Sequence, residues 1–157
     1  MLVKDQTALL IVDIQGVLAR TVYESNLIYD NWQKLIKAAQ LFQLPIILLE
    51  QNPRGLEPTI PELRKLLGDL PAIEKMTFNA CLNEEFLNKL KEIGREQILV
   101  AGIEAHVCVY QTVCGLLKEP YQIYVASDAV SSRTSWNRMA ALEHMRELGA
   151  VITTTEM

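Results

Sequence analysis

Short apolar runs alternate along this chain with longer stretches in which apolar residues recur at helical spacing. The runs predict buried strands, because nearly every position in them is hydrophobic; they lie at residues 7–12, 45–49, 72–75, 97–101, 121–126 and 150–153. The stretches between them predict helices at residues 26–42, 62–67, 83–93, 106–118 and 134–148. This alternation predicts an α/β fold, with a mostly parallel sheet and helices on both faces.

Turn-forming residues mark where these elements end. Asn83 is placed to cap the helix that follows it, and Gly94 to stop it. Gly102 is expected to break the strand before it. Residues 51–61 hold three prolines and a glycine, which predicts an irregular loop.

Composition narrows the class of protein. The chain has 157 residues, which fits one domain over residues 1–157. Its net charge is −4, and no basic run is interleaved with aromatic residues, which disfavours nucleic-acid binding. The apolar runs are too short to span a bilayer. A small-molecule partner therefore fits this composition better than a nucleic acid or a membrane.

The cysteine and histidine content bears on compartment and metal binding. Three cysteines without paired spacing predict free thiols in a reducing compartment. The first residues, Met1 to Asp5, lack a signal-peptide layout, so a cytoplasmic protein is expected. With only two histidines and no metal-ligand spacing, we expect neither a metal site nor another cofactor.

In open parallel sheets, ligands bind beyond the carboxyl ends of the strands. That rule selects the residues that close each predicted strand: Asp13, Glu50, Lys75, Asp128 and the segment 102–108. For any one of the charged residues, solvation of a strand end is a more common role than catalysis.

Cys108 is expected in the first turn of a helix, just beyond a buried strand. Free backbone N–H groups and the helix dipole could stabilise a thiolate there and hold an oxyanion. The alternative is a small buried hydrophobe, and position alone does not decide between them. Asp13 could act as the base, and Lys75 could lower the pKa of the thiol. Cys114 is expected in the core, and Cys81 is interpreted as structural.

Three segments carry a family resemblance. Residues 8–15 read ALLIVDIQ, residues 73–78 read IEKMTF, and residues 102–109 read GIEAHVCV. In this order and spacing they resemble the isochorismatase-like cysteine hydrolases along nearly the whole chain. The loop QNPRGLEPT at residues 51–59, followed by IPEL, looks like a subgroup whose natural substrates are mostly unassigned.

The resemblance implies a three-layer αβα sandwich with strand order 3-2-1-4-5-6, assembled into homo-oligomers. It also implies a cis peptide between Ile103 and Glu104, and a catalytic trio of Asp13, Lys75 and Cys108. The backbone N–H groups of Glu104 and Cys108 would form the oxyanion hole.

Candidate pocket residues are Gln15, Phe78 and His106. Phe78 could equally serve packing, and a structural role is favoured for His106.

Departures from relatives refine the chemistry. Nicotinamidases of this family carry an Asp-x-His metal motif, and here Glu50, Gln51 and Asn52 replace the expected ligands. Members that hydrolyse the ether of isochorismate typically lack the cysteine, so Cys108 favours amide-type chemistry. The expected function is hydrolysis of a small amide, imide or carbamoyl compound through a thioester.

Two other functions compete with this one. A catalytically silent scaffold could act as an interaction protein, because folds do not dictate function. A thiol redox module is disfavoured, because no resolving cysteine stands at CxxC spacing.

Overall fold

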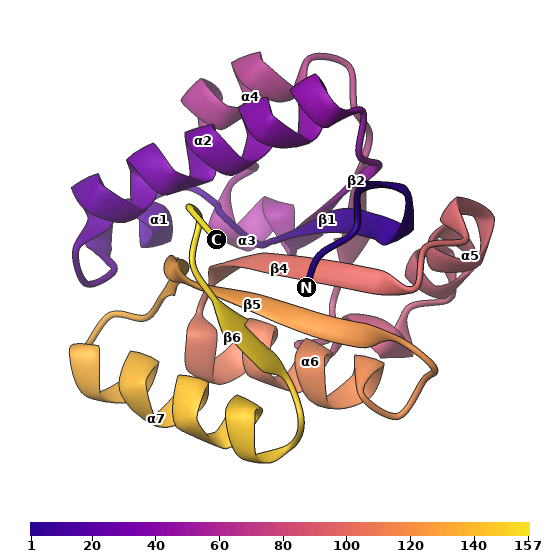
Figure 1. The fold of residues 1–157 in the computed structure, drawn as a ribbon. Coiled ribbons are helices and arrows are strands. Elements are labelled where there is room, and N and C mark those ends of the chain that lie inside the picture. Colours follow the sequence, from indigo (N-terminus) through magenta and orange to yellow (C-terminus); the bar gives the residue numbers. More distant parts are fainter.

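The computed structural model describes residues 1–157, and its centre is a six-stranded sheet whose strands all run parallel. The strand order is β3-β2-β1-β4-β5-β6 (Figure 1), which confirms the predicted order. The strands are β1 (Thr7–Val12), β2 (Ile46–Gln51), β3 (Ala72–Lys75), β4 (Gln97–Ile103), β5 (Gln122–Ser131) and β6 (Val151–Thr153).

Helices cover both faces of the sheet and complete the three layers (Figure 1). The side chains of β1 alternate between two core clusters, with Leu9 and Ile11 in one cluster and Leu10 and Val12 in the other. One face packs against α1 (Leu18–Thr21), α2 (Ser25–Phe42) and α4 (Pro61–Leu67); the other packs against α5 (Glu84–Ile93), α6 (Tyr110–Leu116) and α7 (Ser135–Glu147).

Helix ends follow the sequence signals. The side chain of Asn83 accepts a hydrogen bond from the Phe86 N–H at 3.0 Å, as an N-cap should. Gly94 ends α5 with a left-handed φ of 61°. The predicted cap and stop are therefore both confirmed.

The prediction that Gly102 breaks its strand was wrong. β4 continues through Gly102 to Ile103, and the glycine has a φ of 135°. A Cβ atom there would lie 2.0 Å from the carbonyl oxygen of Val12. Glycine therefore lets the ends of β1 and β4 approach closely, which brings the residues that follow each strand together.

β5 is longer than predicted, since it runs to Ser131 rather than ending at residue 126. Asp128 consequently lies within the strand, and its Oδ1 accepts hydrogen bonds from the N–H (2.8 Å) and hydroxyl (2.9 Å) of Thr155. This carboxylate holds the C-terminal segment against the sheet. The predicted loop at residues 51–61 also contains a short helix, α3 (Pro53–Leu56).

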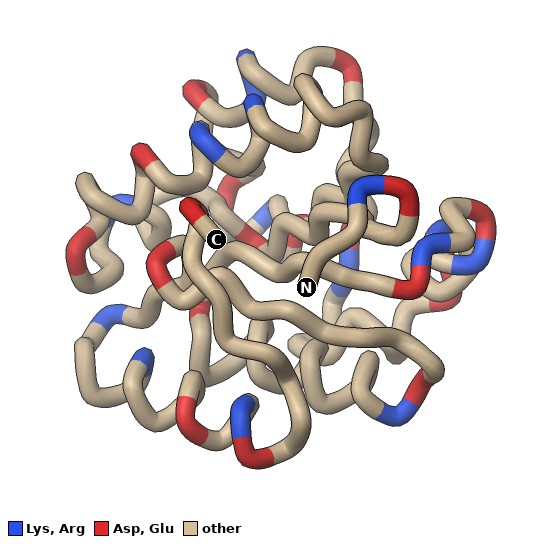
Figure 2. The backbone as a smooth tube through the Cα atoms, in the orientation of Figure 1, with Lys and Arg blue, Asp and Glu red and all other residues tan.

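Charged side chains of both signs are scattered over the backbone, and Figure 2 shows no stripe of lysine and arginine along one element. No helix has the length and apolar character needed to cross a membrane.

Candidate active site

Asp13, Lys75 and Cys108 meet at the carboxyl end of the sheet. Asp13 directly follows β1, Lys75 closes β3, and Cys108 lies in a π-helical turn, Ala105–Val109, between β4 and α6. A cavity of about 380 Å³ opens beside them; its lining residues are Asp13, Leu18, Gln51, Leu56, Phe78, Ile103, Glu104, Val107, Cys108 and Arg133.

Lys75 reaches this site from the edge strand. Its Nζ lies 2.6 Å from Oδ2 of Asp13, and the side chains are 0% and 4% exposed. The same Nζ also donates to the carbonyl oxygen of Thr77 at 3.3 Å. The ammonium therefore lies behind the carboxylate and does not line the cavity.

Asp13 is held in an uncommon backbone conformation, with a φ of 51°. Its N–H donates to the carbonyl oxygen of Leu49 at 3.2 Å. Its Oδ1 is buried and has no hydrogen-bond partner, while Oδ2 is bound by Lys75. One carboxylate oxygen is thus fixed, and the other remains available to accept a proton.

Burial raises the pKa of Asp13 above its ordinary value of 3.8. The Lys75 ammonium, through its charge and its hydrogen bond to Oδ2, and the adjacent Cys108 thiol oppose that rise without cancelling it. The nearby charge of Glu50 adds a smaller upward contribution. Asp13 is consequently a stronger base than an exposed aspartate.

The pKa of Cys108 is also raised, first because the thiol is buried and then because Asp13 lies beside it. Lys75 pulls this pKa down, but burial outweighs its effect. The sequence left a stabilised thiolate and a small buried hydrophobe open at this position, and the net shift is upward. The resting group is therefore a thiol next to a carboxylate.

The backbone at Glu104 could bind a developing oxyanion. The peptide bond between Ile103 and Glu104 is cis. The Glu104 N–H donates to no acceptor in the protein, whereas the Glu104 carbonyl accepts from the N–H groups of Val107 (3.0 Å) and Val109 (3.2 Å). An unpaired donor beside the cavity has the character that such a site requires.

Arg133 is a cavity residue that the sequence did not indicate. Its Nε and Nη2 lie 2.8 Å and 3.3 Å from the two carboxylate oxygens of Glu104, and its backbone N–H donates to that carboxylate at 3.1 Å. Sequence reasoning ended β5 at residue 126, so Arg133 seemed remote from the strand end. A correct strand length would have placed it at the rim.

The candidate pocket residues Gln15 and His106 are not among its lining residues, in line with the structural role favoured for His106. Gln15 is buried and links the end of β2 to the following loop: it donates to the carbonyls of Glu57 (2.6 Å) and Gln51 (3.2 Å), and accepts from the Gln51 N–H (2.7 Å). His106 Nδ1 lies 2.9 Å from the hydroxyl of Ser132. Both residues position the segments around the cavity, whereas Phe78 lines it directly.

Glu50, which the sequence placed just after a strand, lies within β2 and makes a structural contact. Its Oε1 accepts hydrogen bonds from the N–H (2.8 Å) and the hydroxyl (2.6 Å) of Thr59. No group of three or more histidine, cysteine, aspartate or glutamate side chains is arranged to hold a metal ion.

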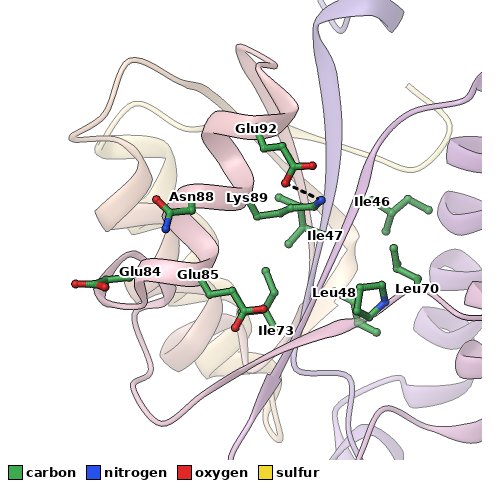
Figure 3. A pocket seen from close by; sticks show the side chains of 11 residues that line it. Ile46, Ile47, Leu48, Leu70, Ile73, Glu84, Glu85, Asn88, Lys89 and Glu92 are labelled. Carbon is green, nitrogen blue, oxygen red and sulfur yellow. Dashed lines mark hydrogen bonds and ion pairs between the residues drawn. The ribbon is translucent and has the colours of Figure 1, made fainter.

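A larger hollow of about 550 Å³, here called the α5 groove, lies beside α5 and the beginnings of β2 and β3 (Figure 3). Its floor is aliphatic, and its charged side chains are Glu84, Glu85, Lys89 and Glu92. It contains no cysteine or histidine.

Comparison with known proteins identifies the family. The isochorismatase domain model matches residues 7–157. The chain is 38% identical to isochorismatase family protein 1B of Dictyostelium discoideum, over 99% of this chain and 77% of that protein.

Two solved structures have the same fold. A structure named as MAR1 ribonuclease from Caenorhabditis elegans superposes with a TM-score of 0.92 at 35% identity, covering 99% of this chain and 80% of that one. The YcaC gene product of Escherichia coli, described as an octameric hydrolase of unknown specificity, gives 0.92 at 31% identity, with coverage of 98% and 77%. The chain therefore belongs to the isochorismatase family, and this membership supports a hydrolase function.

Proposed function

We propose that this protein is a cysteine-dependent hydrolase that cleaves the C–N bond of a small amide, imide or carbamoyl compound. One observation carries the proposal: a buried carboxylate oxygen of Asp13 has no partner, the Cys108 thiol lies beside that carboxylate, and Lys75 fixes the other oxygen. The arrangement unites a nucleophile, a base and a group that orients the base.

In the first step, Asp13 takes the proton of Cys108 as the sulfur attacks the substrate carbonyl carbon. A C–S bond forms, and the carbonyl π electrons move to oxygen. The backbone N–H groups of Glu104 and Cys108 receive this oxyanion. The negative charge passes from Asp13 to the substrate oxygen, and Lys75 keeps the carboxyl group oriented through Oδ2.

In the second step, the tetrahedral intermediate collapses and the C–N bond breaks. The proton held by Asp13 passes to the leaving nitrogen, and a thioester on Cys108 remains. Asp13 then accepts a proton from water as that water attacks the thioester. The acid product leaves, and the proton returns to the sulfur, which restores the resting thiol.

The cavity limits the substrate to a small molecule. Its volume of about 380 Å³ lies toward the lower end of the range for small-molecule sites. A compound with one amide group and a short substituent fits that volume, whereas a polymer would have to present a protruding end.

Nucleic acid is a poor substrate for this cavity, although one structural relative is named a ribonuclease. Both cations near the cavity are already bound by carboxylates, Lys75 by Asp13 and Arg133 by Glu104. No free cation remains there to neutralise a phosphate.

The proposal is tested by ammonia release from a panel of small primary amides and carbamoyl compounds, and by acid formation from imides. Cys108→Ala should lower turnover by at least about a thousandfold, because the covalent route is lost. The matched control is Cys81→Ala, which removes a half-buried thiol outside the cavity and should keep full activity. A thioester on Cys108, trapped by acid quench and detected by mass spectrometry, would be direct support. Full activity of Cys108→Ala on a validated substrate would refute the mechanism.

A catalytically silent scaffold is the second candidate, and the raised pKa of Cys108 is the observation that favours it. It predicts no turnover across the panel and no thioester on Cys108.

Assembly and compartment are proposed on separate grounds. The octameric relative supports a homo-oligomer, which sedimentation analysis would test. Three unpaired cysteines support a reducing, cytoplasmic compartment, which localisation of the tagged protein in its own cells would test.

A further inference from the structure

The cavity carries two ion pairs, and each cation is held by its own carboxylate. Arg133 binds Glu104 through two side-chain contacts, and its backbone N–H donates to the same carboxylate. Glu104 is buried, with a side chain that is 8% exposed, whereas that of Arg133 is 62% exposed. Lys75 and Asp13 form the second pair, which is almost completely buried. The formal charges around the cavity therefore sum to zero.

The remaining lining is mostly apolar. Five side chains supply it, and Gln51 is the only uncharged polar side chain among the lining residues apart from the thiol; the five are Leu18, Leu56, Phe78, Ile103 and Val107. An anion that entered would lose hydration without gaining an unshared cation, which is costly. An uncharged amide would lose much less hydration free energy than an anion, and its apolar part would pack against these side chains.

We propose that the Glu104–Arg133 ion pair makes this cavity selective for uncharged substrates, namely amides with a short apolar substituent, and excludes amides that carry a carboxylate. This proposal rests on the proposed function, because only a hydrolase would use such a preference to choose its substrate. Glu104 is the specificity determinant, because its carboxylate occupies the arginine that would otherwise receive an anionic group.

Two alkylating reagents of nearly equal shape test this without any turnover. Iodoacetamide is neutral and iodoacetate is anionic; with either one, a C–S bond forms at Cys108 and iodide leaves. The ratio of the two rates at Cys108 is measured by peptide mass spectrometry and divided by the same ratio in the urea-unfolded chain. We expect a neutral-over-anionic preference of about tenfold in the folded protein.

Two variants should move this preference in opposite directions. Glu104→Gln leaves Arg133 uncompensated, so iodoacetate should gain about tenfold relative to iodoacetamide. Arg133→Gln leaves the Glu104 carboxylate uncompensated, so the rate with iodoacetate should fall further relative to the rate with iodoacetamide. Glu92→Gln and Lys89→Gln make the same changes in net charge at the exposed pair of the α5 groove and should leave the ratio unchanged.

Equilibrium binding provides a second measurement if Cys108 resists both reagents. Isobutyramide and isobutyrate have nearly the same shape and differ in charge. Isobutyramide should raise the melting temperature of the wild-type protein, and isobutyrate should do so only in Glu104→Gln. Equal or stronger binding of the anion by the wild-type protein, or a Glu104→Gln variant with an unchanged preference, would overturn the proposal.

Failure of the proposed function would look different. The preference for neutral reagents would persist while no amide in the panel released ammonia.

Discussion

Two hollows of the molecule differ in the chemistry that their side chains offer, and the larger of the two offers less. The α5 groove has a volume of about 550 Å³, and the cavity at the carboxyl end of the sheet about 380 Å³. A lysine paired with a carboxylate lies at each of them. The Lys89–Glu92 pair in the groove spans 3.0 Å with side chains 39% and 69% exposed, whereas Lys75–Asp13 spans 2.6 Å at 0% and 4%.

Burial is what separates these two pairs. Water screens an exposed pair, which therefore contributes little to stability. At the cavity the lysine–carboxylate pair is removed from water, and burial raises the pKa of both Asp13 and Cys108. The volume of a hollow is therefore a poorer guide to function than the burial of the charges that line it.

The largest expected effect comes from removing the base. Asp13→Asn should reduce kcat/KM on a validated amide by about a thousandfold or more, because no other buried carboxylate adjoins Cys108 with a free oxygen. Steady-state assays measure this, with circular dichroism to verify folding. The control Glu92→Gln removes a carboxylate from the α5 groove and should retain the wild-type rate. A folded Asp13→Asn enzyme within tenfold of wild type would mean that another group takes the proton.

Matched lysine variants should separate the two hollows by stability. Lys75→Met leaves Asp13 buried without its partner and should cost about 3–5 kcal/mol of unfolding free energy. Lys89→Met breaks an exposed pair and should cost less than about 0.5 kcal/mol. Urea titration measures both. Similar costs for the two variants would show that burial does not distinguish them.

The pH profile should reveal Asp13 through the direction of its shift. Activity requires the carboxylate, so kcat/KM should fall as pH drops through the pKa of Asp13. Burial raises that pKa, so the midpoint should lie above 3.8, the ordinary value for aspartate. Lys75 holds the pKa down, so any residual activity of Lys75→Met should show a midpoint at still higher pH. A wild-type midpoint at or below 3.8 would contradict the assigned base.

Apolar periodicity and turn residues, which are local signals, predicted the alternation of strands and helices, the cap at Asn83 and the candidate residues at the strand ends. The strand order and the trio came from the family resemblance. The local signals did not give the length of β5, since Asp128 and Ser131 read as a polar strand end when their partners are unknown. Arg133 was missed for that reason. Gly102 looked like a strand breaker because only the packed structure shows the Val12 carbonyl close beside it.

The role of Gln15 was equally hidden, because its three hydrogen bonds reach Gln51 and Glu57, which are 36 and 42 residues away in sequence. The sequence did not decide the direction of the Cys108 pKa, since a helix start is visible in sequence and the depth of burial is not. What sequence could not provide, in each case, was the set of partners brought in from distant segments.

The smallest expected effect tests whether the α5 groove contributes to the reaction at all. Asn83→Ala removes the cap of the helix that forms the groove wall, including the acceptor for the Phe86 N–H, and should lower the unfolding free energy by about 1 kcal/mol. Asn88→Ala, on the same helix and in the groove lining, removes an amide that caps nothing and should change stability by less than about 0.5 kcal/mol. Both variants should keep the wild-type kcat/KM, because the trio lies at the carboxyl ends of the strands while the groove begins where β2 and β3 start. A loss of activity in Asn88→Ala at unchanged stability would show that the α5 groove contributes to the reaction.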